Sequence, residues 1–293
     1  MKFIIPTAIT DAMFVSSSVA ENDAAAWNPS TAYAVGALAL LTSTHSVYKR
    51  IVAGTTATSP DVDSTNWVRV GPSNRWAMFD KATGTITTAP GPLTFSVKPG
   101  IGSGVALLDV VGSFLTVTVT DGGSTTYTRR VTMTSVDSTD WFGYFFGDQI
   151  KRTAVAFTDV PMTSTSVVTV TIEGAGNVSC GTFVAGTVVD VGGTKYGLQL
   201  GIVDYSVKST DAFGATTVTQ RSYAKRMTAT AYVDRSRVDY VAQRLASVRA
   251  LPVVWIGSEL YDTSLIYGFF KDFGIDISYS NVSVCSLTIE GLS

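Results

Sequence analysis

The stretch FLTVTVTDGGSTTYTRRVTM, residues 114–133, determines the fold class of this chain. In its first seven residues Leu115, Val117 and Val119 alternate with threonines, so these apolar side chains share one face. A period of two with one apolar face is typical of a half-buried antiparallel strand. The sequence DGG at 121–123 predicts a tight turn, after which residues 125–133 resume the alternation. The stretch therefore predicts an antiparallel β-hairpin.

Further strand patterns recur along the rest of the chain. Thr/Val-rich segments of strand length occupy residues 167–172, 182–190, 252–257 and 284–289, and glycines follow several of them. Short strands separated by Gly-rich turns predict antiparallel sandwiches rather than alternating βαβ units.

One segment, residues 234–248, has a different period. Its apolar positions recur at steps of three, four and three residues, at Val238, Val241, Leu245 and Val248. This spacing predicts a short amphipathic helix. Ser236 and Asp239 are predicted to form its capping box.

Composition excludes two classes of partner. Charged residues make up 15% of the 293 residues, the net charge is −2, and the basic pairs are scattered along the chain. A nucleic-acid groove needs a concentrated positive field, so we expect no nucleic-acid partner. The sequence contains no apolar run of about 18 residues, so no membrane span is expected.

Composition also divides the chain into segments. Residues 1–20 are predicted to form strand, turn and strand, although the apolar start and the ending SVA weakly resemble a signal peptide. A Thr/Pro/Gly-rich connector at 83–92 separates an aromatic segment from the larger β region. The expected units are residues 1–20, an aromatic segment at 21–82, a β-sandwich at 93–175, and a second β-rich domain with the helix at 176–293.

Nucleophilic and metal chemistry have few candidate residues. The chain has one histidine, His45, which we expect in a surface turn, and two cysteines, Cys180 and Cys285, 105 positions apart. Buried free thiols in strands are favoured over a disulfide. These counts supply neither a catalytic triad nor a zinc site, so we expect no enzyme activity, metal or cofactor.

Paired carboxylates leave one catalytic hypothesis open, because glycoside hydrolysis requires only two of them in a groove. Candidates beside aromatic residues are Asp137, Asp140 and Asp204, and Glu259 with Asp262. Loop and strand-end carboxylates without a catalytic role are the favoured interpretation. The functional hypothesis that these carboxylates leave open is a polysaccharide depolymerase.

The aromatic segment has a recognisable skeleton, formed by Trp27, Tyr33, Gly36, Tyr48, Pro60 and Trp67. It resembles the chitin-binding modules of carbohydrate-binding families 5 and 12. The resemblance implies a compact three-stranded sheet, with Trp27, Tyr33 and Tyr48 as glycan contacts. The chain departs from the family after Tyr48, where Lys49, Arg50 and Ile51 stand in place of the exposed aromatic residue of the ligand platform.

The sequence WVRVGPSNRWAMFD, residues 67–80, follows this skeleton. We expect Trp67 to close the small module, residues 71–74 to turn the chain, and Trp76, Met78 and Phe79 to anchor the module to the next unit. The run resembles a junction in tail proteins of tailed bacteriophages. Residues 195–226, 251–257, 265–275 and 286–292 resemble the C-terminal region of the same class.

The resemblance implies a structural component of a phage tail: a tail-tip, baseplate or minor tail protein. Such a protein is made in the host cytoplasm and resides in the virion. Its partners would be copies of itself and other tail proteins, with host cell-surface polysaccharide as a further partner. The alternative is a carbohydrate-binding adhesin that uses the aromatic module to attach to the host.

The expected fold is therefore mainly β. A small three-stranded aromatic module precedes one or two antiparallel β-sandwich domains, with one short amphipathic helix near 234–248. The aromatic run LIYGFF at 265–270 is expected to form either a subunit contact or part of the core.

Overall fold

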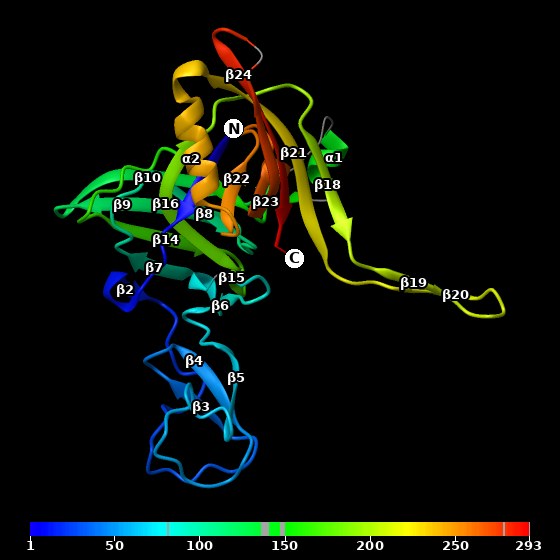
Figure 1. Cartoon of the computed structure of the whole chain (residues 1–293). Coiled ribbons are helices and arrows are strands. Elements are labelled where there is room, and N and C mark those ends of the chain that lie inside the picture. The colour runs from blue at the N-terminus through cyan, green and yellow to red at the C-terminus, as the bar shows by residue number, and fades with distance from the viewer. Residues whose placement is uncertain (81, 136–140, 147–149, 278, 293) are drawn as a thin grey trace.

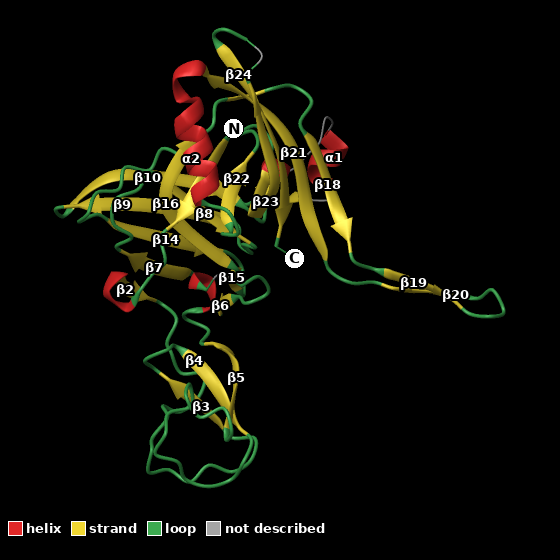
Figure 2. Cartoon of the chain, in the orientation of Figure 1, coloured by secondary structure: helices red, strands yellow, loops and turns green. Residues whose placement is uncertain are grey.

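The computed structural model describes residues 1–80, 82–135, 141–146, 150–277 and 279–292 (Figure 1). Strands predominate, which confirms the prediction of a mainly β chain (Figure 2). The chain forms a body of packed sheets, a small module below it, and a narrow two-stranded arm that projects from its side (Figure 1).

A ten-stranded antiparallel sheet forms the largest part of the body. Its order is β13 (Val155–Phe157), β8 (Gly104–Leu108), β16 (Thr182–Asp190), β1 (Lys2–Pro6), β22 (Val253–Ile256), β23 (Leu265–Asp276), β24 (Val282–Gly291), β21 (Tyr223–Asp234) and β17 (Gly193–Thr194), and β18 (Gln199–Asp204) also pairs with β21. The first strand lies inside this sheet, with Ile4 opposite Val188 on one side and Val254 on the other. The sheet therefore crosses the boundary that the sequence placed between residues 175 and 176.

A five-stranded antiparallel sheet contains the hairpin predicted within residues 114–133. Its order is β10 (Ser124–Thr132), β9 (Phe114–Asp121), β14 (Val167–Glu173), β7 (Leu93–Val97) and β2 (Phe14–Ser17). In the hairpin Thr118 lies opposite Thr128, and a bulge interrupts the register between Thr125 and Tyr127. The predicted hairpin is confirmed.

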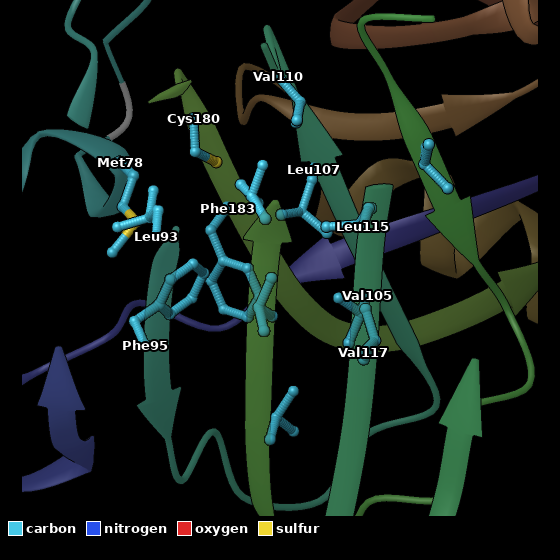
Figure 3. Close-up of a cluster of buried hydrophobic side chains, with 14 of the residues drawn as sticks. Met78, Leu93, Phe95, Val105, Leu107, Val110, Leu115, Val117, Cys180 and Phe183 are labelled. Carbon is cyan, nitrogen blue, oxygen red and sulfur yellow. The ribbon is translucent and has the colours of Figure 1, made fainter. Parts of the chain in front are cut away.

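This sheet packs on the β8–β16 end of the large sheet to form a sandwich. Leu115, Val117 and Val119 all face the shared core, as their alternation predicts. Phe95 and Phe183 meet across it edge to face, with ring centroids 5.1 Å apart (Figure 3). Burial of these side chains stabilises the body through the hydrophobic effect.

The other end of the large sheet is covered by the predicted helix. The 3-10 turn η3 (Arg235–Arg237) leads into α2 (Val238–Ser247), whose Val241 and Leu245 are buried in a second core. The helix is confirmed, but the predicted capping box is wrong. Asp234 instead accepts a hydrogen bond from the Ser236 backbone N–H at 2.9 Å, because the chain first forms η3 before the α-helix begins.

Shorter elements complete the described chain. They are η1 (Asp11–Met13), η2 (Ala77–Phe79), η4 (Asp262–Ser264), α1 (Trp141–Phe146), the pairs β6 (Thr87–Ala89) with β15 (Val178–Cys180), β11 (Thr134–Ser135) with β12 (Ile150–Lys151) and β19 (Val207–Thr210) with β20 (Thr216–Thr219), and the sheet of β3 (Leu38–Leu41), β4 (Ser46–Arg50) and β5 (Trp67–Pro72). That last sheet is the expected three-stranded module. No helix among the described residues is long and apolar enough to span a bilayer.

Three further expectations have clear outcomes. Residues 1–20 form strand, turn and strand, and β1 and β2 belong to different sheets of the body. Cys180 and Cys285 are free and buried, as expected. The run at 265–270 contributes to the core, because Leu265, Ile266 and Tyr267 are all buried.

Candidate functional site

The aromatic side chains of the small module, residues 21–72, pack inward. Tyr48 and Trp67 are buried in the module's own core, and the half-buried Trp27 and Tyr33 pack against them. The ring of Tyr33 meets Trp67 edge to face at 4.9 Å. Its hydroxyl accepts a hydrogen bond from the Asn28 backbone N–H at 2.8 Å. These rings therefore serve first as the core of a unit that is too small to build one otherwise.

Arg50 shows how this module departs from the chitin-binding pattern. Its side chain is buried, and its guanidinium lies over the Trp67 ring at 5.0 Å from the centroid. It also donates a hydrogen bond to the backbone carbonyl of Val52. A cation placed on the ring face stabilises the fold and occupies the surface on which a sugar would stack.

The junction between module and body is built from residues 67–80 and the segment that enters the module, residues 11–23. We expected the turn at 71–74, but β5 continues through Pro72 and the turn begins at Ser73, two residues later than expected. The Ser73 backbone N–H donates to the His45 carbonyl at 2.7 Å, and the N–H groups of Trp76 and Ala77 donate back to the Ser73 carbonyl.

The junction residues divide between two cores. Trp67, 2% exposed, belongs to the core of the small module. Met78 is fully buried in the sandwich core, and Phe79 packs against the same core. Trp76, 8% exposed, lies between the two, with Phe14 and Phe79 each 5.4 Å from its ring centroid. The aromatic surface at this joint is thus covered from both sides.

His45 connects the module to the body. It lies in the β3–β4 turn, as expected, but its ring is largely buried instead of on the surface. The ring stacks on Trp76, with centroids 4.0 Å apart and planes 13° from parallel. Its Nδ1 lies 2.9 Å from Glu21 Oε1, and its Nε2 lies 2.6 Å from Asp11 Oδ1. Only the doubly protonated imidazolium can donate to both carboxylates at once.

Glu21 joins the entering and leaving segments of the module. This mostly buried carboxylate accepts a hydrogen bond from Ser73 Oγ at 2.7 Å, and its Oε2 lies 3.9 Å from Arg75 Nη1. Arg75 in turn donates from Nε to the Val19 carbonyl at 2.8 Å. The two chain connections are therefore bonded to each other, which restricts hinge motion between module and body.

Asn74 adds a third tie between the junction and the body. Its Nδ2 donates to the Thr88 carbonyl at 2.9 Å, and its Oδ1 accepts from the Thr88 N–H at 2.8 Å. Its own backbone N–H donates to Asp23 Oδ2 at 3.1 Å. The loop after β5 is thus bonded to β6 and to the entering segment.

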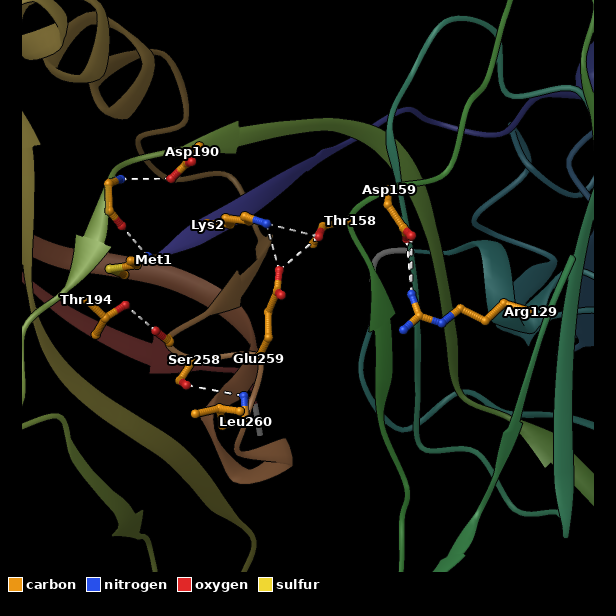
Figure 4. A network of polar contacts seen from close by, with 12 residues as sticks. Met1, Lys2, Arg129, Thr158, Asp159, Asp190, Thr194, Ser258, Glu259 and Leu260 are labelled. Atoms are coloured by element: carbon orange, nitrogen blue, oxygen red, sulfur yellow. Dashed lines mark hydrogen bonds and ion pairs between the residues drawn. The ribbon is translucent and has the colours of Figure 1, made fainter. Parts of the chain in front are cut away.

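The candidate carboxylates Glu259 and Asp262 lie beside a surface hollow of about 320 Å³. Each is paired with a cation. Glu259 lies 2.7 Å from Lys2 Nζ (Figure 4), and Asp262 lies 2.5 Å from Arg152 Nε. The hydrogen bond from Lys2 is the main cause that lowers the pKa of Glu259. A glycosidase acid needs the opposite shift, so Glu259 does not fit that role.

Of the other candidate carboxylates, the structure describes Asp204. Asp204 caps the Ser206 backbone N–H at 2.8 Å at the end of β18, and hydrogen bonding from Ser206 lowers its pKa. Asp137 and Asp140 lie outside the described residues. Within the part of the chain that the structure describes, His, Cys, Asp and Glu side chains form no group of three or more that could hold a metal.

Sequence reasoning missed two groups of exposed apolar residues. Four aromatic side chains of α1 are exposed, namely Trp141, Phe142, Phe145 and Phe146. The arm carries exposed Val207, Phe213 and Val218. The clustering of aromatics in WFGYFF at 141–146 was a visible signal for the first group. The arm strands contain one apolar residue each, Val207 in β19 and Val218 in β20, which gives no such signal.

Comparison with known proteins adds no assignment: no protein-family model and no curated protein matches the chain.

Proposed function

We propose that the chain is a structural subunit of a bacteriophage tail, whose contacts with other subunits are its function. The observation that carries this proposal is the exposure of large apolar side chains on α1 and on the projecting arm. Monomeric soluble proteins rarely expose grouped apolar residues, and such groups mark contact surfaces. The resemblance of residues 67–80 and the C-terminal runs to phage tail proteins supports the choice of assembly.

The tied junction also fits an assembling subunit. A module held by His45, Glu21 and Asn74 keeps a fixed orientation to the body, which a repeating assembly requires of each copy. In this proposal the chain is not an enzyme, and host polysaccharide is a secondary partner. The carbohydrate-binding adhesin has less support, because the rings that it needs are packed in the module's core.

Immunogold electron microscopy of phage particles from the host that carries the gene tests the proposal. An antibody against the purified chain should label the tail, at its tip or baseplate. A matched antibody against the major capsid protein should label heads only. Particles whose tails carry no label would contradict the proposed function.

A further inference from the structure

The arm, residues 205–222, is a projecting ribbon with no packed face. Its strands β19 and β20 form a two-stranded sheet of their own, and all residues from 207 to 223 are exposed. Figure 1 shows the arm leading away from the body. A two-stranded hairpin of this kind is marginally stable in water unless a further strand or surface covers it. We therefore expect a binding partner to cover at least one face of the arm.

The tip of the arm is an ordered turn that presents one aromatic ring. Asp211 Oδ1 accepts hydrogen bonds from the backbone N–H groups of Phe213 at 2.9 Å and Ala215 at 2.8 Å. Gly214 adopts a φ of 85°, a conformation that side chains other than glycine rarely take. This turn leaves the Phe213 ring 96% exposed.

The root of the arm is fixed to the body. The Tyr205 hydroxyl donates to Glu290 Oε1 at 3.0 Å, and Glu290 also forms an ion pair with Lys271. Across the root the Arg221 N–H donates to Ser206 Oγ at 3.0 Å. These bonds set the direction in which the arm leaves the sheet.

A groove of about 500 Å³ lies at the other end of β18, and it is lined mainly by apolar side chains. Tyr196 and Leu260 are 102% and 85% exposed, and Leu198, Leu200 and Tyr261 complete its apolar lining. The hydrogen bond from Thr194 Oγ1 to the Gly257 carbonyl at 2.6 Å connects the two loops that form it. This hydrogen bond holds the two loops that line the groove next to each other.

The chain's own arm does not cover this groove. Leu200 of the groove lies near the start of β18, and Phe213 follows thirteen residues later, beyond the end of that strand. Extended chain rises about 3.3 Å per residue, and the arm points away from the body. One chain thus carries an exposed ring and an exposed apolar groove that cannot meet within the same molecule.

This self-complementarity favours a second copy of the chain as the occupant. The groove contains a single charged residue, Lys195, and Phe213 brings none, so shape and apolar burial would dominate the contact. A contact between two different surfaces of identical chains is head-to-tail. Such contacts generate rings or filaments rather than closed dimers.

We propose that Phe213 of one copy inserts into the groove formed by Tyr196, Leu200, Leu260 and Tyr261 of a neighbouring copy. This inference rests on the proposed function in that it names the interface through which tail subunits associate. The interface also gives the arm the packed surface that it lacks in the isolated chain.

Cysteine cross-linking tests the contact directly. Burial raises the pKa of the two native thiols, to about 12 for Cys180 and about 11 for Cys285, so neither should react in the folded chain. The probes are placed beside the contact, at exposed positions that leave the Phe213 ring and the apolar groove intact, as Ala212→Cys in one preparation and Lys195→Cys in another. Under mild oxidation a mixture of the two should give a covalent dimer, and each variant alone should not.

Three cross-linking results would overturn the proposal. The first is no dimer in the mixture at the highest soluble concentration. The second is a dimer from Ala212→Cys alone, which indicates arm-to-arm pairing, and the third is a dimer from Lys195→Cys alone. The double variant should form a ladder of cross-linked oligomers, and a single closed dimer in its place would also contradict a head-to-tail contact.

Analytical ultracentrifugation measures the strength of the same self-association without covalent cross-linking. Phe213→Ala should weaken self-association at least tenfold, and Leu260→Asp should do the same from the groove side. Val62→Ala, at an exposed position on the small module, is the matched control and should leave association unchanged. Circular dichroism confirms that each variant folds. Unaltered association of Phe213→Ala, or a wild-type chain that stays monomeric, would overturn the inference.

The two proposals fail in different ways. A labelled tail together with a negative cross-link removes the arm contact and leaves the tail role. A positive cross-link together with unlabelled particles removes the tail role and leaves the arm contact.

Discussion

The junction and the arm are both narrow connections with aromatic residues, but they treat those residues in opposite ways. At the junction Trp67 is buried in the core of the module, and Trp76 is buried between the module and the body. On the arm Phe213 is exposed and belongs to none of the hydrophobic cores formed by the described residues. Aromatic residues at the junction therefore hold the molecule together internally, whereas those on the arm are available to another molecule.

Each region is entered and left once, so the difference lies in what packs around the two connecting segments. The module is entered and left through adjacent segments, which His45 and Glu21 bond to each other. The arm is one hairpin, and its bonds to the body lie at its root, through Tyr205 and Glu290. A surface closed on both sides excludes water, whereas a free ribbon exposes its side chains on both faces.

The largest expected effect is the difference in free energy of unfolding between a substitution at the junction and one on the arm. Trp76→Ala removes a buried ring from the joint and should lower the free energy of unfolding by about 3–5 kcal/mol. Phe213→Ala, at an exposed tip, should change it by less than about 0.5 kcal/mol. Urea denaturation at a concentration where the chain is monomeric measures both. Equal effects would refute the contrast between a buried joint and an exposed arm.

A smaller effect is expected at His45. Because its backbone φ is 48°, His45→Asn is the suitable variant, since asparagine tolerates the left-handed region. It removes the stack on Trp76 and shortens the link to Asp11 and Glu21, at a cost of about 1–2 kcal/mol. Small-angle scattering should show a broader range of module orientations.

Ser43→Ala, at an exposed position in the same turn, is the control for His45→Asn, and its scattering should match the wild type. If His45→Asn leaves the scattering profile unchanged, Trp76 and Asn74 suffice to fix the module, and His45 plays no part in its orientation.

The elements that sequence predicted well are those that depend on local periodicity. Residues 182–190 were predicted as a strand with the observed bounds, and the helix was placed within residues 234–248. The continuity of the large sheet was missed because its pairings are remote in sequence. Lys2, for example, lies opposite Asp190 and Ile256.

Local pattern has the same limit at the junction and on the arm. Trp67, Trp76, Met78 and Phe79 could be expected at a joint because they flank one turn. The carboxylates around His45 could not, because they come from residues 34 and 24 positions earlier. For the arm, residues 207–210 and 216–219 contain one apolar residue each, and their sequence does not reveal whether a core lies on either face.

The attachment of the arm root should depend on pH. The hydrogen bond from Lys271 is the main cause that lowers the pKa of Glu290, and Tyr205 contributes. Because the pKa of Glu290 is lowered in the folded chain, its ionised carboxylate stabilises the fold, and this contribution is fully present at pH values above the ordinary pKa of 4.5. The contribution is lost as the pH falls through the lowered pKa.

Hydrogen exchange of the Tyr205 and Val207 amides, measured from pH 6 down to about pH 3 and corrected for the intrinsic rate, should detect this loosening. Glu290→Gln should show faster corrected exchange already at pH 6 and little further change on acidification. Protection that is the same in both proteins across this range would show that Glu290 does not secure the arm.

The smallest expected effect concerns sugar binding. It tests whether the aromatic rings of the module are buried, like those at the junction, or available to another molecule, like Phe213 on the arm. A pyranose stacks on a flat, accessible ring, but Tyr48 is buried and Trp27 and Tyr33 pack against the core. The whole chain should therefore pass through chitin beads without retention, and Tyr33→Ala should behave identically. Retention that Tyr33→Ala abolishes, in a variant that remains folded, would make the module a second contact surface. The junction would then be the region, among these three, whose aromatic residues serve internal packing alone.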